Sequence, residues 1–303
     1  FDRATRSWVY RMAKNEGGII GFGSTYRIHE PGALVFANAP FPVLEEEQQP
    51  TPPVVIGEGY CRTPFAGRSL VNVSAMSFGA ISRPAVLALS RGAAAAGCWL
   101  DTGEGGLSPY HLDGGCDLIF QIGTAKYGVR DEHGQLSDQR LRELAAQASV
   151  RAFEIKLSQG AKPGKGGVLL GTKVTAEIAQ IRGIPEGRDS LSPNRHPDIA
   201  SVDQLLDRIE HVREVTGKPV GVKTAIGGER FMRELTAAIE RRGLRSAPDF
   251  LTIDGGEGGS GAAPQALADH MALSIDEALP LVADALFASG LQERIRLIAA
   301  GQL

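Results

Sequence analysis

Short apolar runs alternate with amphipathic segments along most of this chain. Seven runs of mainly apolar residues have the length and composition of buried strands. They cover residues 70–75, 98–102, 117–121, 152–157, 219–223, 249–253 and 294–299. Between these runs, apolar residues recur at helical spacing, which predicts amphipathic helices. The helices are expected at residues 83–97, 137–149, 172–183, 201–216, 229–242 and 274–290.

The segment 201–216 shows the helical pattern most clearly. Its apolar residues fall on one helical face, namely Val202, Leu205, Leu206, Ile209 and Val212. Ser201 followed by Gln204 predicts a capping box at the start of this helix. Ser274 with Glu277 repeats the same device, so both residue pairs indicate where a helix begins.

Strands that alternate with helices predict a parallel sheet. Several of the strand-like runs end in glycine together with a carboxylate, an amide or a lysine. Polar groups at the C-terminal ends of successive parallel strands are typical of a (β/α)8 TIM barrel. Because seven strand-like runs are present, we expect an α/β barrel truncated at its C-terminus after about the seventh strand.

Residues 1–69 have a different pattern from the rest of the chain. They contain the acidic run Glu45–Glu47 and prolines at positions 31, 40, 42, 50, 52, 53 and 64. Proline removes a backbone donor and biases the residue before it away from helix. Apart from a short helix at 2–14, we therefore expect an extended arm that packs on a barrel domain of residues 70–303.

Composition excludes several classes of function. A net charge of −3 over 303 residues gives no electrostatic reason to expect a nucleic acid as a partner. The three cysteines, Cys61, Cys98 and Cys116, are far apart, and no histidines have metal-ligand spacing, so no metal site is expected in this chain. No run approaches the roughly 18 apolar residues of a membrane span. We expect a cytoplasmic protein, and because residue 1 is Phe, an upstream segment that tethers it to a membrane stays open.

The densest glycine cluster follows the run at 249–253. It reads Asp254-Gly-Gly-Glu-Gly-Gly-Ser-Gly-Ala-Ala-Pro264. Glycine has no side chain, so such a turn can bring backbone N–H groups close to a flat or anionic ligand. Since so many glycines cost chain entropy on folding, we interpret the cluster as a ligand site rather than a flexible surface turn.

The polar residues near the strand ends are rich in lysine and amide groups. They are Ser77, Glu104, Gln121, Lys126, Lys156, Gln159, Lys162, Lys223 and Asp254. Lysines at a barrel mouth suit a phosphate, a carboxylate or an electron-rich cofactor ring, and several glycine-rich turns suit a flat ligand such as a flavin. Lys126 and Lys162 are also compatible with solvated loop positions. Lys156 and Lys223 lie inside apolar runs, where a lysine needs a partner, so we assign a function to these two.

Five motifs, in this order, resemble the FMN-binding synthase domain of glutamate synthase. They are Ser74-Ala-Met-Ser-Phe-Gly-Ala-Ile-Ser82, Thr102-Gly-Glu-Gly-Gly106, Lys156-Leu-Ser-Gln-Gly-Ala-Lys-Pro-Gly-Lys-Gly-Gly167, Ser192-Pro-Asn-Arg-His-Pro-Asp-Ile199 and the glycine cluster at 254–264. The likeness covers about residues 70–303. The segment Arg6-Ser-Trp-Val-Tyr-Arg-Met-Ala-Lys14 is similar to stand-alone bacterial members of the same family.

The resemblance implies a barrel that holds FMN at its C-terminal mouth. Ammonia, free or derived from glutamine, would react with 2-oxoglutarate to form 2-iminoglutarate, which takes hydride from reduced FMN to give L-glutamate. By motif, the FMN contacts would be Ser74, Ala75, Met76, Gln121, Lys156, Lys223, Asp254, Gly255, Gly256, Gly258 and Gly259. The substrate contacts would be Gln159, Lys162 and Lys126, with Glu104 and Lys162 as the catalytic residues.

Two departures from the family pattern leave alternatives open. Val168 stands where the large glutamate synthases have glutamine, and no glutaminase domain with a catalytic cysteine is present in this sequence. A flavin subunit like that of N-methylglutamate synthase, using methylamine, and a flavin-binding scaffold without turnover are the alternatives. The resemblance also implies an electron donor or glutaminase partner that the sequence does not identify, and it leaves homo-oligomer formation open. Any [3Fe-4S] cluster of the full-length protein would have its ligands beyond residue 303.

Overall fold

The chain divides into two compact units, Phe1–Pro42 and Val43–Leu303. The computed structural model describes residues 3–19, 21–23 and 37–301. The second unit contains the sheet, most of the helices and every residue of the site considered below.

The first unit contains helix α1 (Arg3–Ala13). This is the helix expected at 2–14, although Asp2 lies outside the described residues. Proline 31 of the expected arm also lies outside them. The division into units falls inside the arm, so a domain boundary at residue 69 stays a prediction.

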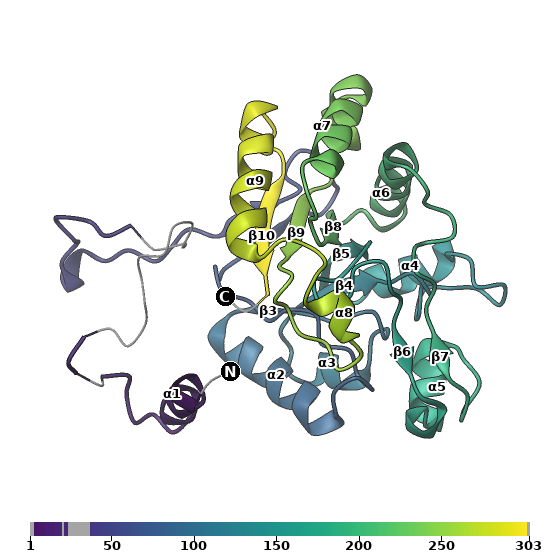
Figure 1. Ribbon diagram of the computed structural model, residues 1–303, viewed down its shortest axis with the longest axis horizontal. Helices are drawn as coiled ribbons and strands as arrows, with labels where there is room; N and C mark the ends of the chain where they lie inside the picture. The colour runs from purple at the N-terminus through teal and green to yellow at the C-terminus, as the bar shows by residue number, and fades with distance from the viewer. Residues whose placement is uncertain (1–2, 20, 24–36, 302–303) are drawn as a thin grey trace. The chain divides into compact units, whose positions relative to one another are not determined.

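Six strands form one parallel sheet in the second unit (Figure 1). They are β3 (Trp99–Asp101), β4 (Asp117–Ile122), β5 (Val150–Lys156), β8 (Val220–Thr224), β9 (Phe250–Asp254) and β10 (Arg296–Ala300). Their spatial order, β3-β4-β5-β8-β9-β10, follows the order along the chain without a reversal. A doubly wound sheet would reverse its order at a switch point, whereas a TIM barrel does not. The predicted α/β barrel fold is therefore confirmed, as a curled parallel sheet that forms part of a barrel.

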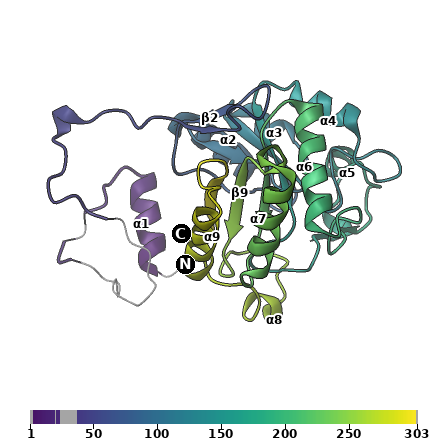
Figure 2. The ribbon, with the colours of Figure 1, turned by 90° about the horizontal axis from the view of Figure 1, so that it is seen from above.

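Helices follow the strands in alternation. They are α2 (Arg83–Ala96), α3 (Pro109–Asp113), α4 (Asp138–Ala145), α5 (Ala176–Arg182), α6 (Val202–Thr216), α7 (Arg230–Arg242), α8 (Gln265–Ala268) and α9 (Ile275–Ala288), with short 3-10 turns at Glu45–Glu47, Gly171–Lys173 and Leu244–Ser246. Helices α6, α7 and α9 lie side by side along the outer face of the sheet (Figure 2). In the part of the chain that the structure describes, no helix is both long and apolar enough to cross a membrane.

The run expected as a strand at 70–75 is reduced to a single bridge. Val73 pairs in parallel with Leu100, and its N–H and C=O groups bond Trp99 and Asp101 of β3 at 3.0 Å. Before it, the Ser69 hydroxyl bonds the backbone of Val71, which is exposed. Local side-chain bonds of this kind compete with a strand ladder. The segment thus takes the position of a strand beside β3 without extending into one.

Two short antiparallel strand pairs were not expected from the sequence. The first joins β1 (Val54–Ile56) to β2 (Phe65–Gly67), and its Ile56 and Phe65 pack against the buried base of the sheet. The second joins β6 (Val168–Leu169) to β7 (Ser190–Leu191). Strands of two or three residues are too short for a periodic pattern to reveal.

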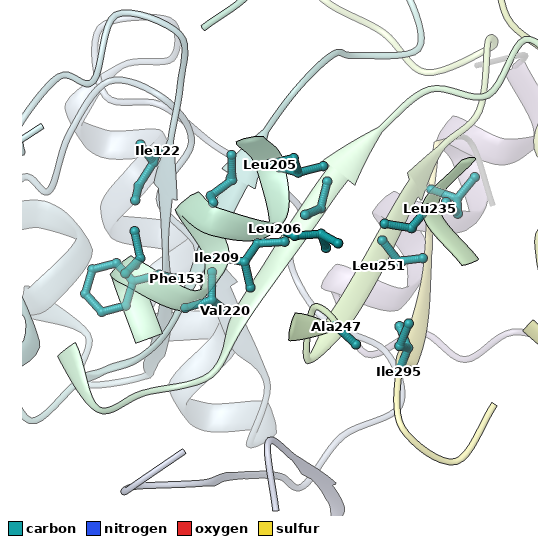
Figure 3. Packing of buried hydrophobic residues seen from close by; sticks show 14 of the residues in the cluster. Ile122, Phe153, Leu205, Leu206, Ile209, Val220, Leu235, Ala247, Leu251 and Ile295 are labelled. Carbon is teal, nitrogen blue, oxygen red and sulfur yellow. The ribbon is translucent and has the colours of Figure 1, made fainter. Parts of the chain in front are cut away.

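The core lies between the sheet and the helices that cover it (Figure 3). Leu206 and Ile209 of α6 are fully buried against Val220 and Leu251 of the sheet. Each such side chain stabilises the fold by about 1.5–3 kcal/mol relative to leaving it exposed. Inside the barrel, a Cβ at Gly221 would lie 2.3 Å from the ring of Phe250, so only glycine leaves room for that ring.

Candidate functional site

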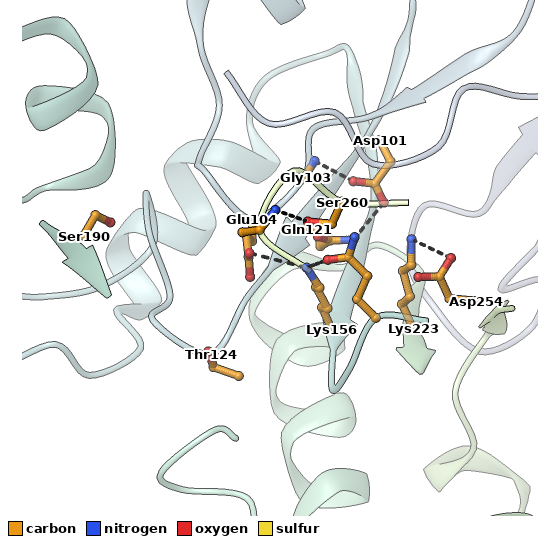
Figure 4. Close-up of polar contacts among 12 residues, drawn as sticks. Asp101, Gly103, Glu104, Gln121, Thr124, Lys156, Ser190, Lys223, Asp254 and Ser260 are labelled. Atoms are coloured by element: carbon orange, nitrogen blue, oxygen red, sulfur yellow. Dashed lines mark hydrogen bonds and ion pairs between the residues drawn. The ribbon is translucent and has the colours of Figure 1, made fainter. Parts of the chain in front are cut away.

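Polar side chains from successive strands gather at the C-terminal edge of the sheet (Figure 4). Glu104 follows β3, Gln121 lies in β4, and Lys156, Lys223 and Asp254 lie at the ends of β5, β8 and β9. The register places Lys156 directly opposite Lys223 on neighbouring strands. Alternation of side chains along a strand points these residues to the same face, so the sheet itself assembles the cluster.

Glu104 and Lys156 form an ion pair at this edge. Their Oε1 and Nζ atoms are 3.4 Å apart, and both side chains are mostly buried, at 19% and 12% exposed. The Lys156 ammonium also donates to Oε1 of Gln159 at 3.1 Å, and the amide of Gln159 donates to the carbonyl of Gly259 at 3.3 Å. One carboxylate, one ammonium and one amide therefore meet at the end of β5.

Lys223 is the more deeply buried of the two strand lysines. Its Nζ lies 3.7 Å from Oδ1 of Asp254, and both side chains are less than a tenth exposed. Burial acts to lower the pKa of Lys223, but the carboxylates of Asp254, Glu154 and Asp101 outweigh it, so the pKa is raised. The ammonium stays charged inside the barrel. Oδ2 of Asp254 accepts the backbone N–H of Gly160 at 2.8 Å, which joins β9 to the turn after β5.

Gln121, which the sequence predicted, belongs to a buried polar network whose other members, Asp101, Glu154 and Thr252, were not predicted. The Gln121 amide nitrogen donates to Glu154 at 2.7 Å and approaches Asp101 at 3.5 Å, and the Thr252 hydroxyl donates to Glu154 at 2.6 Å. Burial, and then the charge of Glu154, raise the pKa of Asp101 well above its usual range. Asp101 and Glu154 each sit in an apolar strand run, which is the signal that identified Lys156 and Lys223.

Oε1 of Gln121 is the exception in this network. Among the described residues it is buried and has no hydrogen-bond partner. A buried acceptor without a donor costs about 1–3 kcal/mol, so such an atom usually awaits a partner.

The backbone N–H groups of the glycine turn are largely occupied within the chain. Those of Gly255, Gly256 and Gly258 donate to the carbonyls of Ala300, Leu273 and Gly255 at 2.8–2.9 Å. Glu257 reaches away from the mouth and accepts the N–H of Ile275 at the start of α9. The turn therefore fixes Asp254 and α9 relative to the sheet, and it leaves the N–H groups of Glu257, Gly259, Ser260 and Gly261 without a partner among the described residues.

The segment Ser74–Met76 runs beside the end of β3. The Met76 N–H donates to the carbonyl of Asp101 at 3.1 Å, and the Met76 carbonyl lies 2.9 Å from Nε2 of His111. Ser74 is exposed, whereas Ala75 and Met76 are half-buried. Burial lowers the pKa of His111, so this imidazole is neutral near neutral pH and holds the segment in place.

The two remaining predicted lysines have different surroundings. Lys162 is buried, with 4% of its surface exposed, and burial lowers its pKa against the opposing charge of Glu104. Lys126 has a φ of 55° and its ammonium pairs with Asp198 at 3.1 Å. Asp198 is held in turn by Arg208. The charge of Lys162 thus interacts with that of Glu104, whereas Lys126 forms an ion pair with Asp198.

Arg182, at the end of α5, is a second residue that sequence reasoning missed. Its guanidinium is buried against the loop after β3, where a Cβ at Gly105 would lie 3.2 Å from Nη2. It donates weakly to Ser190 and Phe78, and its Nε has no partner within the described ranges. Burial lowers the pKa of Arg182, and the described salt bridges include none to it. Arg182 lies four residues after Ile178, so a cation on an apolar helix face was the available signal.

Comparison with known proteins gives a consistent family. The sequence model described as "Conserved region in glutamate synthase" matches residues 36–303. The glutamate synthase large subunit-like protein YerD of Bacillus subtilis is 38% identical over 341 aligned positions, which cover 100% of this chain and 64% of that protein. An archaeal-type glutamate synthase [NADPH] of Thermotoga maritima is 38% identical over 233 positions, covering 76% of this chain and 42% of the relative.

Among solved structures, a mutant flavocytochrome b2 with benzoylformate aligns with 84% of this chain and 58% of its own. Its TM-score is 0.48 and its sequence identity 11%. The chain spans between 42% and 64% of the length of the two relatives named above.

Proposed function

Because the chain belongs to the glutamate synthase family, we propose that its barrel mouth binds FMN and aminates 2-oxoglutarate to L-glutamate. The observation that carries this proposal is the buried Glu104–Lys156 pair beside Lys223. A barrel mouth with two ammonium groups suits an anionic ring system and an anionic substrate. The glutamate synthase names of the relatives support the same reaction class.

The described residues fit a flavin. Lys156 and Lys223 would stabilise the negative charge that a reduced flavin ring carries. The unpartnered Oε1 of Gln121 would accept an N–H of the ring, which removes the cost of a buried orphan acceptor. The predicted contacts of Ser74, Ala75 and Met76 would line the ring from the β3 side. Of the predicted glycine contacts, Gly259 keeps an unbonded N–H among the described residues, as do its neighbours Ser260 and Gly261, so this part of the turn would suit the phosphate end.

When bound, FMN would supply the hydride that reduces the imine. The residues of the chain would prepare that imine. Glu104 would hold ammonium and take a proton from it, which frees the nitrogen lone pair to attack the carbonyl carbon of 2-oxoglutarate. Two protons from the nitrogen, the first carried by Glu104, would pass to the carbonyl oxygen of 2-oxoglutarate, which leaves as water. The protonated imine that remains would then accept hydride at its carbon to give the amine.

The substrate carboxylates would bind cations and amides around Glu104. We assign this role to Lys162 and Gln159, and we add Arg182, because a buried guanidinium without a carboxylate partner suits a bidentate anion. We also propose that Lys126 contacts the substrate, although in this structure its ammonium pairs with Asp198. A substrate that competes with Asp198 for Lys126 would be needed for contact.

The test is a flavin assay on the full-length protein. An absorbance spectrum shows whether a flavin is bound, and after anaerobic reduction the protein is mixed with 2-oxoglutarate and an amine. We expect ammonium and 2-oxoglutarate together to reoxidise the flavin and to yield L-glutamate. Faster reoxidation by methylamine would favour the N-methylglutamate alternative, and no reoxidation by either amine would favour a scaffold.

Glu104→Gln keeps the shape of the side chain and removes its charge. We expect this variant to bind flavin and to lose about two powers of ten or more in ammonia-dependent reoxidation, the usual size of a general acid–base contribution. Unchanged reoxidation would rule out the proton-transfer role. Loss of the flavin would show instead that Glu104 holds the site together.

A further inference from the structure

We propose that Gly123 and Gly167 form a slot that sets the position of the Glu104 carboxylate. This inference rests on the proposed function, because it concerns the residue to which proton transfer is assigned. A Cβ added at Gly123 would lie 2.6 Å from Cβ and 2.9 Å from Oε2 of Glu104. A Cβ added at Gly167 would lie 2.6 Å from Oε1 of Glu104. All three separations are shorter than real Cβ contacts allow, so the Glu104 side chain occupies space that any residue other than glycine would fill.

Backbone conformation does not explain these two glycines. Neither has a positive φ, so an L-residue could adopt the backbone of either position. Many other glycines of the chain do have a positive φ, including Gly103 and Gly106 on either side of Glu104. The loop of Glu104 therefore needs glycine for its turn, whereas Gly123 and Gly167 need to be glycine for the space they leave.

The slot differs from the close backbone crossings nearby. A Cβ at Gly160 would lie 1.7 Å from the carbonyl oxygen of Gly255, and one at Gly166 would lie 1.9 Å from that of Ser192. Those positions bring two backbones together, so a side chain there would disturb the fold. At Gly167 the first atom met is the end of the Glu104 side chain, and the other neighbours lie at 3.4 Å. A methyl group at 167 would thus displace the carboxylate and leave the backbone in place.

The slot sets where the Glu104 carboxylate lies relative to Lys156. Gly123 directly follows β4 and Gly167 directly precedes β6, so two backbone segments lie close to the Glu104 side chain while its Oε1 pairs with Lys156. A displacement of about 1 Å in a reacting group can cost about 10²-fold in rate. Gly123 and Gly167 are accordingly positioning residues that act through Glu104.

Gly167→Ala tests the slot, with Gly227→Ala as the matched control. Gly227 also follows a strand end, has no positive φ, and would place its Cβ in open space. Crystal structures of both variants report the Glu104 Oε1 to Lys156 Nζ distance without reference to activity. Ammonia-dependent flavin reoxidation is then measured for Gly167→Ala, Glu104→Ala and the double variant.

We expect Gly167→Ala to displace the carboxylate and to slow reoxidation by about 10²-fold, with Gly227→Ala unchanged in both. In the Glu104→Ala background, the added methyl group should have no further effect, because the atom it meets is gone. If Gly167→Ala fails to fold, Glu104→Ala must restore folding.

An unmoved carboxylate in Gly167→Ala would overturn the proposal, and so would a methyl effect that persists without the Glu104 side chain. A displaced carboxylate without a change in ammonia-dependent rate would support the slot and contradict the proposed role of Glu104 in catalysis. The structural and kinetic measurements thus separate failure of the slot from failure of the proposed function.

Discussion

Asp101 is a buried carboxyl at the barrel mouth whose surroundings favour its protonated form. Its carboxyl lies near Glu154 with Lys223 as the cation facing both, while Asp254 competes for that lysine. Gly103 donates its N–H to Oδ1 at 2.7 Å, and Gln121 approaches Oδ2. Like charges this close favour a proton on one of them. The raised pKa therefore means that the folded chain keeps a proton that the unfolded chain releases.

This arrangement predicts how stability depends on pH. Since the folded pKa of Asp101 lies above its unfolded value, its contribution to stability is fully present below about pH 4. That contribution is lost as pH rises through the folded pKa. Asp101→Asn mimics the protonated carboxyl, so we expect the variant to lose less stability than the wild type as pH rises above about 4. Denaturant unfolding at several pH values measures this, and Asp117→Asn at a half-exposed site is the control. Equal pH slopes for Asp101→Asn and the wild type would contradict the shared proton.

The sequence revealed the charged residues of the site better than their partners. Lys156 and Lys223 stood out because lysine is rare inside an apolar run, and the structure places both at the mouth. The partner of Lys126 could not be foreseen, because Asp198 lies more than seventy residues away in sequence. The slot at Gly123 and Gly167 was hidden for a related reason. A glycine kept for space has the same sequence signature as one kept for a turn.

At the scale of elements, periodicity predicted the helices closely. The helix expected at 201–216 is α6, and the Ser201 hydroxyl accepts the N–H of Gln204 as its cap requires. The Gln204 amide, however, accepts from Ala200 rather than closing the box on Ser201. The periodic pattern did not predict the short elements, including the two antiparallel strand pairs and the five-residue helix α3. Their shape depends on contacts with distant parts of the chain, which a local pattern does not encode.

Glu257 joins the turn after β9 to the start of α9, so we expect its replacement to weaken the start of that helix. Both of its carboxylate oxygens accept the N–H of Ile275, at 3.0 and 3.1 Å, so it caps α9 from the glycine turn after β9. Glu257→Ala leaves this N–H unpaired and should cost about 1 kcal/mol of stability, the usual cost of a lost cap. Glu257→Gln is the control, because an amide oxygen still accepts the bond. Hydrogen exchange should quicken at the start of α9 in the alanine variant alone, and uniform protection in both variants would argue against the cap.

At the scale of the molecule, the two ends of the barrel are stabilised differently. At the C-terminal mouth, two buried polar atoms of the described residues have no hydrogen-bond partner, namely Oε1 of Gln121 and Nε of Arg182. At the opposite end, the buried carboxylate of Asp249 has partners for both of its oxygens. There Asp249 pairs with Arg213 at 2.9 Å and with Arg294 at 3.0 Å, and it also accepts the N–H of Val220. The unpaired polar groups lie at the end of the barrel where a ligand could bond them. The paired groups lie at the end that contributes to stability alone.

Asp249 therefore bears on the stability of the whole second unit. It is fully buried and holds two arginines from α6 and from the segment before β10, and Arg294 stacks on the ring of Tyr60 at 3.7 Å. Asp249→Ala leaves both guanidinium groups buried without their counter-charge. Breaking a buried pair in this way costs about 3–5 kcal/mol, which denaturant unfolding would detect as a lower midpoint.

Asp203→Ala is the comparison for this loss. Asp203 forms an even shorter pair with Arg241, at 2.6 Å, but both side chains are more than half exposed. An exposed pair contributes about 0–1 kcal/mol, because water solvates both partners once they separate. Replacement of aspartate by alanine should thus lower the free energy of unfolding several times more at position 249 than at position 203. Similar losses at the two positions would show that the base of the barrel does not depend on its buried charges.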